Sequence, residues 1–431
     1  MTGHPSASAA TEVRDQAIGR RAGAGSRTFH QRAGVALLAS GLSSLSSFLT
    51  SISITRGESL TGVGQFALAF SVYVLVIGLV RATVTEAVLA GRTGQSATGD
   101  GIRRAGAIGA GAGALVLGIG LGVGSPYLVV VGPALWGLVI YDYVRGVNLG
   151  VGTPWAACAQ DAGWAAMTVM SVGTAFLVPV PPVLIFTVWA FSGAAIGVVT
   201  AVRQGHRLTP GWGLDAVTSR TAASFGGQFL VTSGSAQLAL TLVAATAGVG
   251  VVGALGAAQT ALSPVTLLIA PLSALVVPYL GRARPVTRWA RFVTAGPVLL
   301  ASVGLILPLV IAICLLPDDI GRIVLGDNWT AARPLLPMLG IETVLVPVAL
   351  VAFAGHRVQH AGGRALLVGA VLGLVRVTVV VGGGLLFQAE GTAAARTGVA
   401  VTAAFVWWLS YLTLRDRPVD RAAAQATVAS A

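Results

Sequence analysis

Long apolar runs follow one another along almost the whole chain, and they limit what this sequence can fold into. Twelve of them can be placed, at residues 33–54, 63–90, 105–124, 126–149, 158–178, 183–202, 222–247, 251–280, 292–316, 335–355, 365–388 and 393–414. An α-helix needs about 20 apolar residues to cross the ~30 Å hydrocarbon layer of a membrane. Only 10% of the residues are charged, whereas soluble domains carry roughly 25%. The sequence therefore predicts an all-α integral membrane protein with about 12 transmembrane helices.

The distribution of arginine predicts how the chain is oriented. With the N-terminal tail placed inside, the predicted cytoplasmic segments contain 20 arginines and the predicted outside loops contain 3, an asymmetry typical of cytoplasmic loops. We therefore expect a multi-pass protein of the cell membrane with both termini in the cytoplasm. Residues 1–32 are polar and basic and contain no apolar stretch like that of a signal peptide, so a disordered cytoplasmic tail is expected there, with a second tail at 415–431.

A basic loop at 203–221 divides the predicted spans into two sets of six. We expect an N-terminal lobe at 33–202 and a C-terminal lobe at 222–414. A weak internal similarity links the two, because Gly62–Ala67 is similar to Val252–Ala257 at an offset near 190. Two sets of six spans that enter the membrane from the same side would form a parallel repeat about an axis normal to the membrane.

Missing residue types exclude several chemistries. The chain contains no lysine, and both the Walker A phosphate loop and the Schiff base of pyridoxal enzymes need one. Its two cysteines and five histidines show no metal-binding spacing. A GxGxxG-like match at 248–253 has no acidic residue after it until Asp318, unlike a dinucleotide-binding fingerprint. We therefore expect no enzyme activity, no cofactor, no metal and no nucleic acid partner.

Several segments resemble one family of exporters. They are GVGQFALAFSVYVL at 62–75, LVRATVTEAVL at 79–89, YDYVRG at 141–146, AAQTALSPVTLLIAPLSALVVPYLGR at 257–282 and LGDNWTAARPLLP at 325–337. Over about residues 33–414 the chain resembles the Wzx-type polysaccharide and O-antigen flippases of the multidrug/oligosaccharidyl-lipid/polysaccharide (MOP) exporter superfamily.

The resemblance implies both a fold and a cargo. The fold is a V-shaped bundle of two six-helix lobes around a central cavity that opens to either side in turn, as in the related multidrug-and-toxin-extrusion (MATE) antiporters. The cargo is an oligosaccharide linked to polyprenyl pyrophosphate. The implied partners are membrane lipids, a polysaccharide polymerase and glycosyltransferases.

Ionisable side chains inside the predicted spans are the candidate functional residues, because each costs at least ~2.5 kcal/mol to insert. Arg376 lies about halfway along its span and is the first candidate for a cation that faces a cavity and binds the headgroup. Arg81 is a second such candidate. For both, an ion pair with a neighbouring helix is the alternative. Arg396 lies close to the end of the last predicted span, where we expect an interfacial anchor.

The remaining candidates are one arginine and four carboxylates. Asp142 and Arg145 are three residues apart, about 60° around a helix, which favours an intrahelical ion pair. The alternative makes Arg145 a phosphate contact, because a guanidinium binds phosphate oxygens in bidentate fashion. Glu86 is expected to pair elsewhere or to meet the cytoplasmic interface. Asp161 and Glu342 could carry coupling protons or sodium ions, although stabilisation of a helix N-terminus is the alternative for Asp161.

Three functions fit these observations. In the leading hypothesis, arginines between the lobes neutralise the pyrophosphate of a lipid-linked oligosaccharide while alternating access moves it from the inner to the outer leaflet. The second is a cation-coupled drug or metabolite antiporter of the same superfamily, which needs a cavity rich in carboxylates. The third is a membrane scaffold of a glycan-assembly complex that transports nothing itself.

Overall fold

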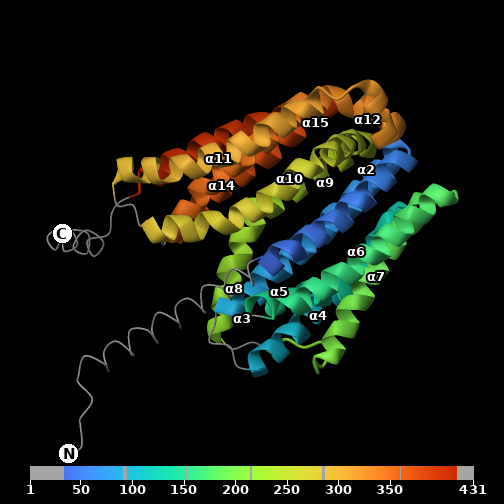
Figure 1. The fold of residues 1–431 in the computed structure, drawn as a ribbon, viewed down its shortest axis with the longest axis horizontal. Coiled ribbons are helices and arrows are strands. Elements are labelled where there is room, and N and C mark those ends of the chain that lie inside the picture. Colours follow the sequence, from blue (N-terminus) through green and yellow to red (C-terminus); the bar gives the residue numbers. More distant parts are fainter. Residues whose placement is uncertain are drawn as a thin grey trace, which may run out of the picture.

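The computed structural model describes residues 34–90, 95–151, 153–213, 216–283, 287–359 and 361–414. Within these ranges the chain is almost entirely helical and contains no β-strand. The long helices run side by side in two groups (Figure 1). The two predicted tails, 1–32 and 415–431, lie outside the described residues.

The N-terminal lobe contains six membrane-crossing segments. The first is Gly34–Gly57. The second, Leu60–Ala90, combines α2 (Leu60–Val80), the π-helix η1 (Arg81–Thr85) and α3 (Glu86–Ala90). The other four are α4 (Gln95–Val123), α5 (Pro126–Gly150), α6 (Pro154–Leu177) and α7 (Pro182–Arg203). The helices α5, α6 and α7 each begin with a proline, where the missing N–H costs no intrahelical hydrogen bond. The most buried helix of this lobe is α5, which packs between α4 and α7.

The C-terminal lobe supplies the other six segments. The first combines α8 (Ala216–Phe229), the π-helix η2 (Leu230–Gly234) and α9 (Ser235–Thr246). The next three are α10 (Val249–Ala283), α11 (Arg288–Cys314) and α14 (Leu336–Val358). The last two are the halves of α15 (Gly362–Leu412), which is interrupted at Phe387 and Gln388.

The interruption makes α15 a hairpin. Gln388 has φ 53° and ψ −133°, outside the helical region. A Cβ added to Gly383 would lie 2.4 Å from the carbonyl oxygen of Gly391, and a Cβ on Gly391 would lie 2.2 Å from that of Gly383. Only glycine allows such close approach of two backbones. The two halves are therefore arms that touch beside the turn.

The number of predicted spans is confirmed. By length and composition, 10 helical segments among the described residues qualify as membrane-spanning. One of them, Gly362–Leu412, contains two crossings because of the hairpin. The helix α6 is too polar to qualify by composition, but its 24 residues are long enough to cross and it packs on α5 and α7. The largest shift concerns α4, which begins at Gln95 rather than at 105. The reason is that a helix can continue through polar residues after it has left the apolar layer.

The helices α2 and α10 join the lobes at one end of the bundle. A Cβ on Gly64 would lie 2.1 Å from the carbonyl oxygen of Val249, and a Cβ on Gly253 would lie 1.9 Å from that of Leu60. The contacts are reciprocal, since Leu60 and Gly64 correspond to Val249 and Gly253 at the same offset of 189 residues. The lobes thus meet symmetrically within the two similar segments, with a pairing shifted by one residue from the offset of 190 that relates Gly62–Ala67 to Val252–Ala257.

A short segment after α11 covers the same end, which we call the α12 end. It consists of α12 (Asp318–Leu325), η3 (Gly326–Asn328), α13 (Trp329–Ala332) and η4 (Arg333–Leu335), and Figure 1 shows α12 beside the start of α2. The buried Asn328 donates from Nδ2 to the carbonyl oxygens of Thr55 and Glu58, at 2.7 and 2.8 Å. This segment of the C-terminal lobe is therefore tied to the connection between the first two spans.

The lobes diverge towards the opposite end, where α8 lies between them (Figure 1). This helix packs on the N-terminal lobe, because Phe229 lies against Gly78 and Gly226 lies against Thr83. The two lobes thus contact each other through α2 and α10 at the α12 end, and through α8 nearer the opposite end.

Candidate functional site

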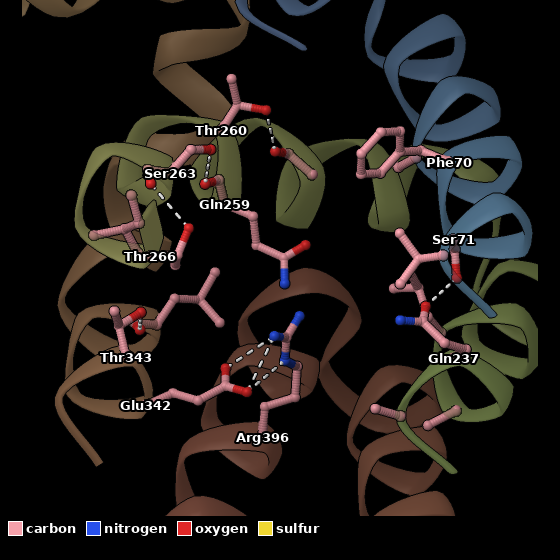
Figure 2. A pocket seen from close by; sticks show the side chains of 18 of the residues that line it. Phe70, Ser71, Gln237, Gln259, Thr260, Ser263, Thr266, Glu342, Thr343 and Arg396 are labelled. Atoms are coloured by element: carbon pink, nitrogen blue, oxygen red, sulfur yellow. Dashed lines mark hydrogen bonds and ion pairs between the residues drawn. The ribbon is translucent and has the colours of Figure 1, made fainter. Parts of the chain in front are cut away.

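A cavity of about 480 Å³ lies between the lobes and begins beside the α2–α10 crossing. Ser51 of the first span and Phe66, Phe70 and Ser71 of α2 form its N-terminal wall. The other walls come from α9, α10, α14 and both arms of α15. Figure 2 shows that amide, hydroxyl and charged side chains from these helices point into one space. The cavity is therefore built mainly by the C-terminal lobe.

Arg396 and Glu342 form an ion pair in the cavity wall (Figure 2). Nη2 of Arg396 lies 3.1 Å from Oε1 and 3.0 Å from Oε2 of Glu342. Gln259 of α10 faces the same guanidinium, and with its carbonyl oxygen turned towards Arg396 it accepts from Nη1 and Nη2 at 2.8 and 2.7 Å. One charged and one neutral acceptor thus hold Arg396 in place.

The position of Arg396 corrects a prediction, because an interfacial anchor was expected there. The second arm of α15 begins just after Gln388. At 1.5 Å per residue, Arg396 therefore lies roughly 12 Å along this arm from the turn. The apolar pattern alone began the last span at 393 and so placed Arg396 too near its end.

Arg376, on the first arm of α15, lines the same cavity. Its Nη1 donates to the carbonyl oxygen of Thr232 at 3.0 Å, and no ion pair of Arg376 occurs among the described residues. Glu342 and Arg396 are close enough to act on its charge. Thr232 belongs to the π-helix η2, a type of helix that often occurs at functional sites. Within the described part of the chain, the positive charge of Arg376 thus has a carbonyl partner but no carboxylate partner.

Two glutamines of this site were missed by the sequence analysis. Gln237 of α9 accepts a hydrogen bond from Ser71 of α2 in one wall of the cavity (Figure 2), and Gln259 holds Arg396. Each is an isolated amide inside a long apolar run, which is the signal that could have identified it. An amide in an apolar medium is costly unless it is hydrogen-bonded, so its presence in a span indicates a polar interior.

The other candidate residues lie in the N-terminal lobe, outside the lining of this cavity. Arg81, at the start of η1, forms an ion pair with Asp142 of α5, and its Nε lies 3.2 Å from Oδ2. Arg145 of α5 pairs with Asp161 of α6, with Nε 2.9 and 2.8 Å from the two carboxylate oxygens. Glu86 is exposed at the start of α3.

The predicted intrahelical pair between Asp142 and Arg145 is therefore wrong. Each of the two residues pairs with a different neighbouring helix, which neutralises both charges and also joins the helices. The Asp161 side chain is fully buried and additionally accepts from the Tyr141 hydroxyl. Arg145 also donates to Ser40 of the first span at 3.3 Å. This cluster thus links the first span, α5 and α6.

The fold has known relatives, although no protein-family model and no curated protein sequence matches the chain. It is similar to an inward-facing multidrug resistance MATE family transporter of the MOP superfamily, with a TM-score of 0.60 and 13% identity over 88% of this chain and 97% of that one. An outward-facing multidrug resistance MATE family transporter of the MOP superfamily is similar with a TM-score of 0.58 and 12% identity, over 89% of this chain and 94% of that one. A MOP superfamily transporter from Pyrococcus furiosus is similar with a TM-score of 0.57 and 12% identity, also over 89% of this chain and 94% of that one. The chain has the MOP transporter fold.

The MOP fold agrees with the V-shaped bundle of two six-helix lobes that the sequence resemblance implied. Solved structures with this fold include inward-facing and outward-facing conformations. The similarity is one of fold, so what the cavity of this chain binds has to be inferred from the chemistry of its lining.

Proposed function

We propose that the protein is a flippase that moves an oligosaccharide linked to polyprenyl pyrophosphate from the inner to the outer leaflet by alternating access. The charge of the cavity carries the proposal. Two arginines and one glutamate line the cavity, which leaves a net positive charge, and Arg376 has no carboxylate partner among the described residues. An anionic headgroup fits such a site better than a cation does.

A pyrophosphate needs a charged partner in order to cross the membrane. An unpaired charge in an apolar medium costs many kcal/mol, and pairing removes much of this cost. The planar guanidinium of Arg376 can bind two phosphate oxygens at once. A cavity of about 480 Å³ has the size of a small-molecule site, so it accommodates the pyrophosphate and the first sugars while the lipid tail remains in the bilayer.

The proposal requires no covalent chemistry. A membrane potential that is negative inside favours outward movement of an anion by about 2.3 kcal/mol per charge per 100 mV. Glycosyltransferases would supply the cargo and a polymerase would use it, so these are the proposed partners. The ion pairs of Arg81 and Arg145 favour a role for both arginines in holding the N-terminal lobe together rather than in binding the headgroup.

A cation-coupled multidrug antiporter is the second candidate, because the similar structures are described as multidrug transporters. Binding of a cation needs an available carboxylate, and the carboxylate of the cavity lining, Glu342, is paired with Arg396. The Pyrococcus furiosus structure is described as having a binding pocket of reverse polarity that suggests a different function. Pocket polarity can therefore differ between proteins with this fold, and the net positive charge of the cavity in this chain favours the flippase here.

Arg376→Ala tests the proposal. Purified protein in nanodiscs is titrated with undecaprenyl pyrophosphate and, separately, with the organic cation tetraphenylphosphonium. The wild type is expected to bind the pyrophosphate, and R376A to bind it at least about tenfold more weakly, since a charge-assisted bidentate contact is lost. In cells, R376A is expected to reduce polysaccharide export while the protein accumulates normally.

Arg322→Ala is the matched control, because Arg322 is exposed on α12 and lies outside the cavity lining. It should leave both binding and export unchanged. Wild-type binding and export by R376A would remove Arg376 from the mechanism. Binding of tetraphenylphosphonium but not of undecaprenyl pyrophosphate by the wild type would contradict the flippase and favour the antiporter.

A further inference from the structure

The two arginines of the cavity differ in their partners. The guanidinium of Arg396 faces both carboxylate oxygens of Glu342 on one side and the carbonyl oxygen of Gln259 on another. Arg376 donates to the backbone carbonyl of Thr232. Arg376 can therefore accept an anion directly, whereas an anion that approaches Arg396 meets a carboxylate already bound there.

Glu342 presents to Arg396 the same chemistry as a phosphate would. A carboxylate and a phosphate each offer a pair of oxygens that match the planar guanidinium. The Arg396 and Glu342 side chains are 19% and 23% exposed and both line the cavity. The pair therefore lies at the surface that a ligand would contact, unlike the Arg145–Asp161 pair, whose aspartate is completely buried.

We propose that Glu342 is an internal competitor of the anionic headgroup, and that a pyrophosphate binds by displacing Glu342 from Arg396. This inference rests on the proposed flippase function and specifies how its binding site is regulated. The first phosphate binds Arg376, and the second replaces Glu342 at the guanidinium of Arg396. Gln259 keeps Arg396 in position during the exchange, since its amide is neutral and does not repel the ligand.

The competition has two consequences. It weakens binding, because the ligand must replace an existing ion pair and then lies close to a displaced negative charge. It also assists release, because Glu342 can return to Arg396 as the ligand leaves. Removal of the Glu342 charge should therefore give a transporter that binds its cargo more tightly and exports it more slowly.

Glu342→Gln tests the inference. In nanodiscs, E342Q is expected to bind undecaprenyl pyrophosphate about tenfold more tightly than the wild type, with slower dissociation, because two charges a few ångströms apart interact strongly in this environment. The double variant Glu342→Gln/Arg396→Gln should lose this gain, since the gain acts through Arg396. Glu390→Gln is the matched control. It makes the same charge change at an exposed position outside the cavity lining and should bind like the wild type.

The possible outcomes separate the inference from the proposed function. If R376A binds more weakly but E342Q binds no more tightly than the wild type, Glu342 only positions Arg396, and the inference is overturned while the flippase stands. An equal gain in E390Q, or a gain that persists in the double variant, would also overturn it. If the wild type and E342Q both fail to bind undecaprenyl pyrophosphate although thermal unfolding shows that they are folded, both proposals fail.

Discussion

Single residues decide which buried charges hold the protein together and which remain available for a ligand. Arg145 and Asp161 neutralise each other between two helices of the N-terminal lobe. Arg376 is satisfied only by a carbonyl among the described residues. The sequence located all of these charges, because an ionisable residue within an apolar run is conspicuous. It did not reveal their partners. The partners of Arg81 and Arg145 lie 61 and 16 residues away in the sequence, whereas helix periodicity predicts only pairs three or four residues apart.

Arg145→Ala tests the structural role of the buried pair. It leaves the fully buried Asp161 without a cation, and breaking a buried ion pair in this way costs about 3–5 kcal/mol. We expect a large fall in the temperature of unfolding, measured by intrinsic fluorescence of the purified protein. The double variant Arg145→Met/Asp161→Leu should recover most of the loss, because neither charge then remains buried alone.

Arg81→Ala is the comparison for this experiment, because it leaves behind Asp142, whose side chain is 10% exposed, whereas Asp161 is completely buried. Its unfolding temperature should fall less than that of R145A. An R145A variant as stable as the wild type would show that the pair is not structural.

At the scale of helices, the departures from regular geometry build the site. The π-helix η2 contains the carbonyl that binds Arg376, and the turn at Phe387 and Gln388 brings both arms of α15 to the cavity. The lengths of the spans could be predicted because they follow from the thickness of the membrane. The π-helices and the rotation of each helix about its axis could not, since they depend on packing against helices that are distant in sequence.

The glycine contacts between α2 and α10 give a prediction for helix packing. A Cβ on Gly253 would lie 1.9 Å from the Leu60 carbonyl oxygen. The blocking atom belongs to the backbone, so no side-chain rotation can relieve the clash, and the helices must separate by about 1.5 Å to reach a normal contact. We expect Gly253→Ala to lengthen the distance between spin labels at Val178 and Ile320, both exposed at the α12 end, in a background without native cysteines.

Gly250→Ala is the matched control for the same helix, because a Cβ at Gly250 would have no heavy atom within 4 Å. Its spin-label distances should equal those of the wild type. Equal distances in G253A and G250A would show that the two lobes do not depend on this crossing.

At the scale of the whole molecule, the proposed alternating access requires that the contacts at the α12 end break when the cavity opens on that side. These contacts are the α2–α10 crossing and the hydrogen bonds of Asn328 to Thr55 and Glu58. The two-lobe arrangement and the number of spans could be predicted from the sequence. The closing contacts could not, because Asn328 reaches the first span across 273 residues of sequence.

Asn328→Ala should favour opening at the α12 end. It removes two hydrogen bonds, one to the buried Thr55 carbonyl and one to the partly buried Glu58 carbonyl, each with a net contribution of about 1 kcal/mol. In a background without native cysteines, Ser263→Cys places a thiol in the cavity lining. A membrane-impermeant maleimide added from the α12 side should label this thiol several-fold faster in N328A. The nearby exposed Thr330→Ala should not change the rate, and an unchanged rate in N328A would contradict the role of these bonds in closure.

The hairpin of α15 has a consequence for selectivity. Arg376 and Arg396 stand on its two arms, and the arms touch at Gly383 and Gly391 with only a tight turn between them. Because no long flexible loop joins the arms, the spacing of the two guanidinium groups should stay constant while the lobes move. In the proposed flippase, this constant spacing would select a cargo by the separation of its anionic groups rather than by their total charge.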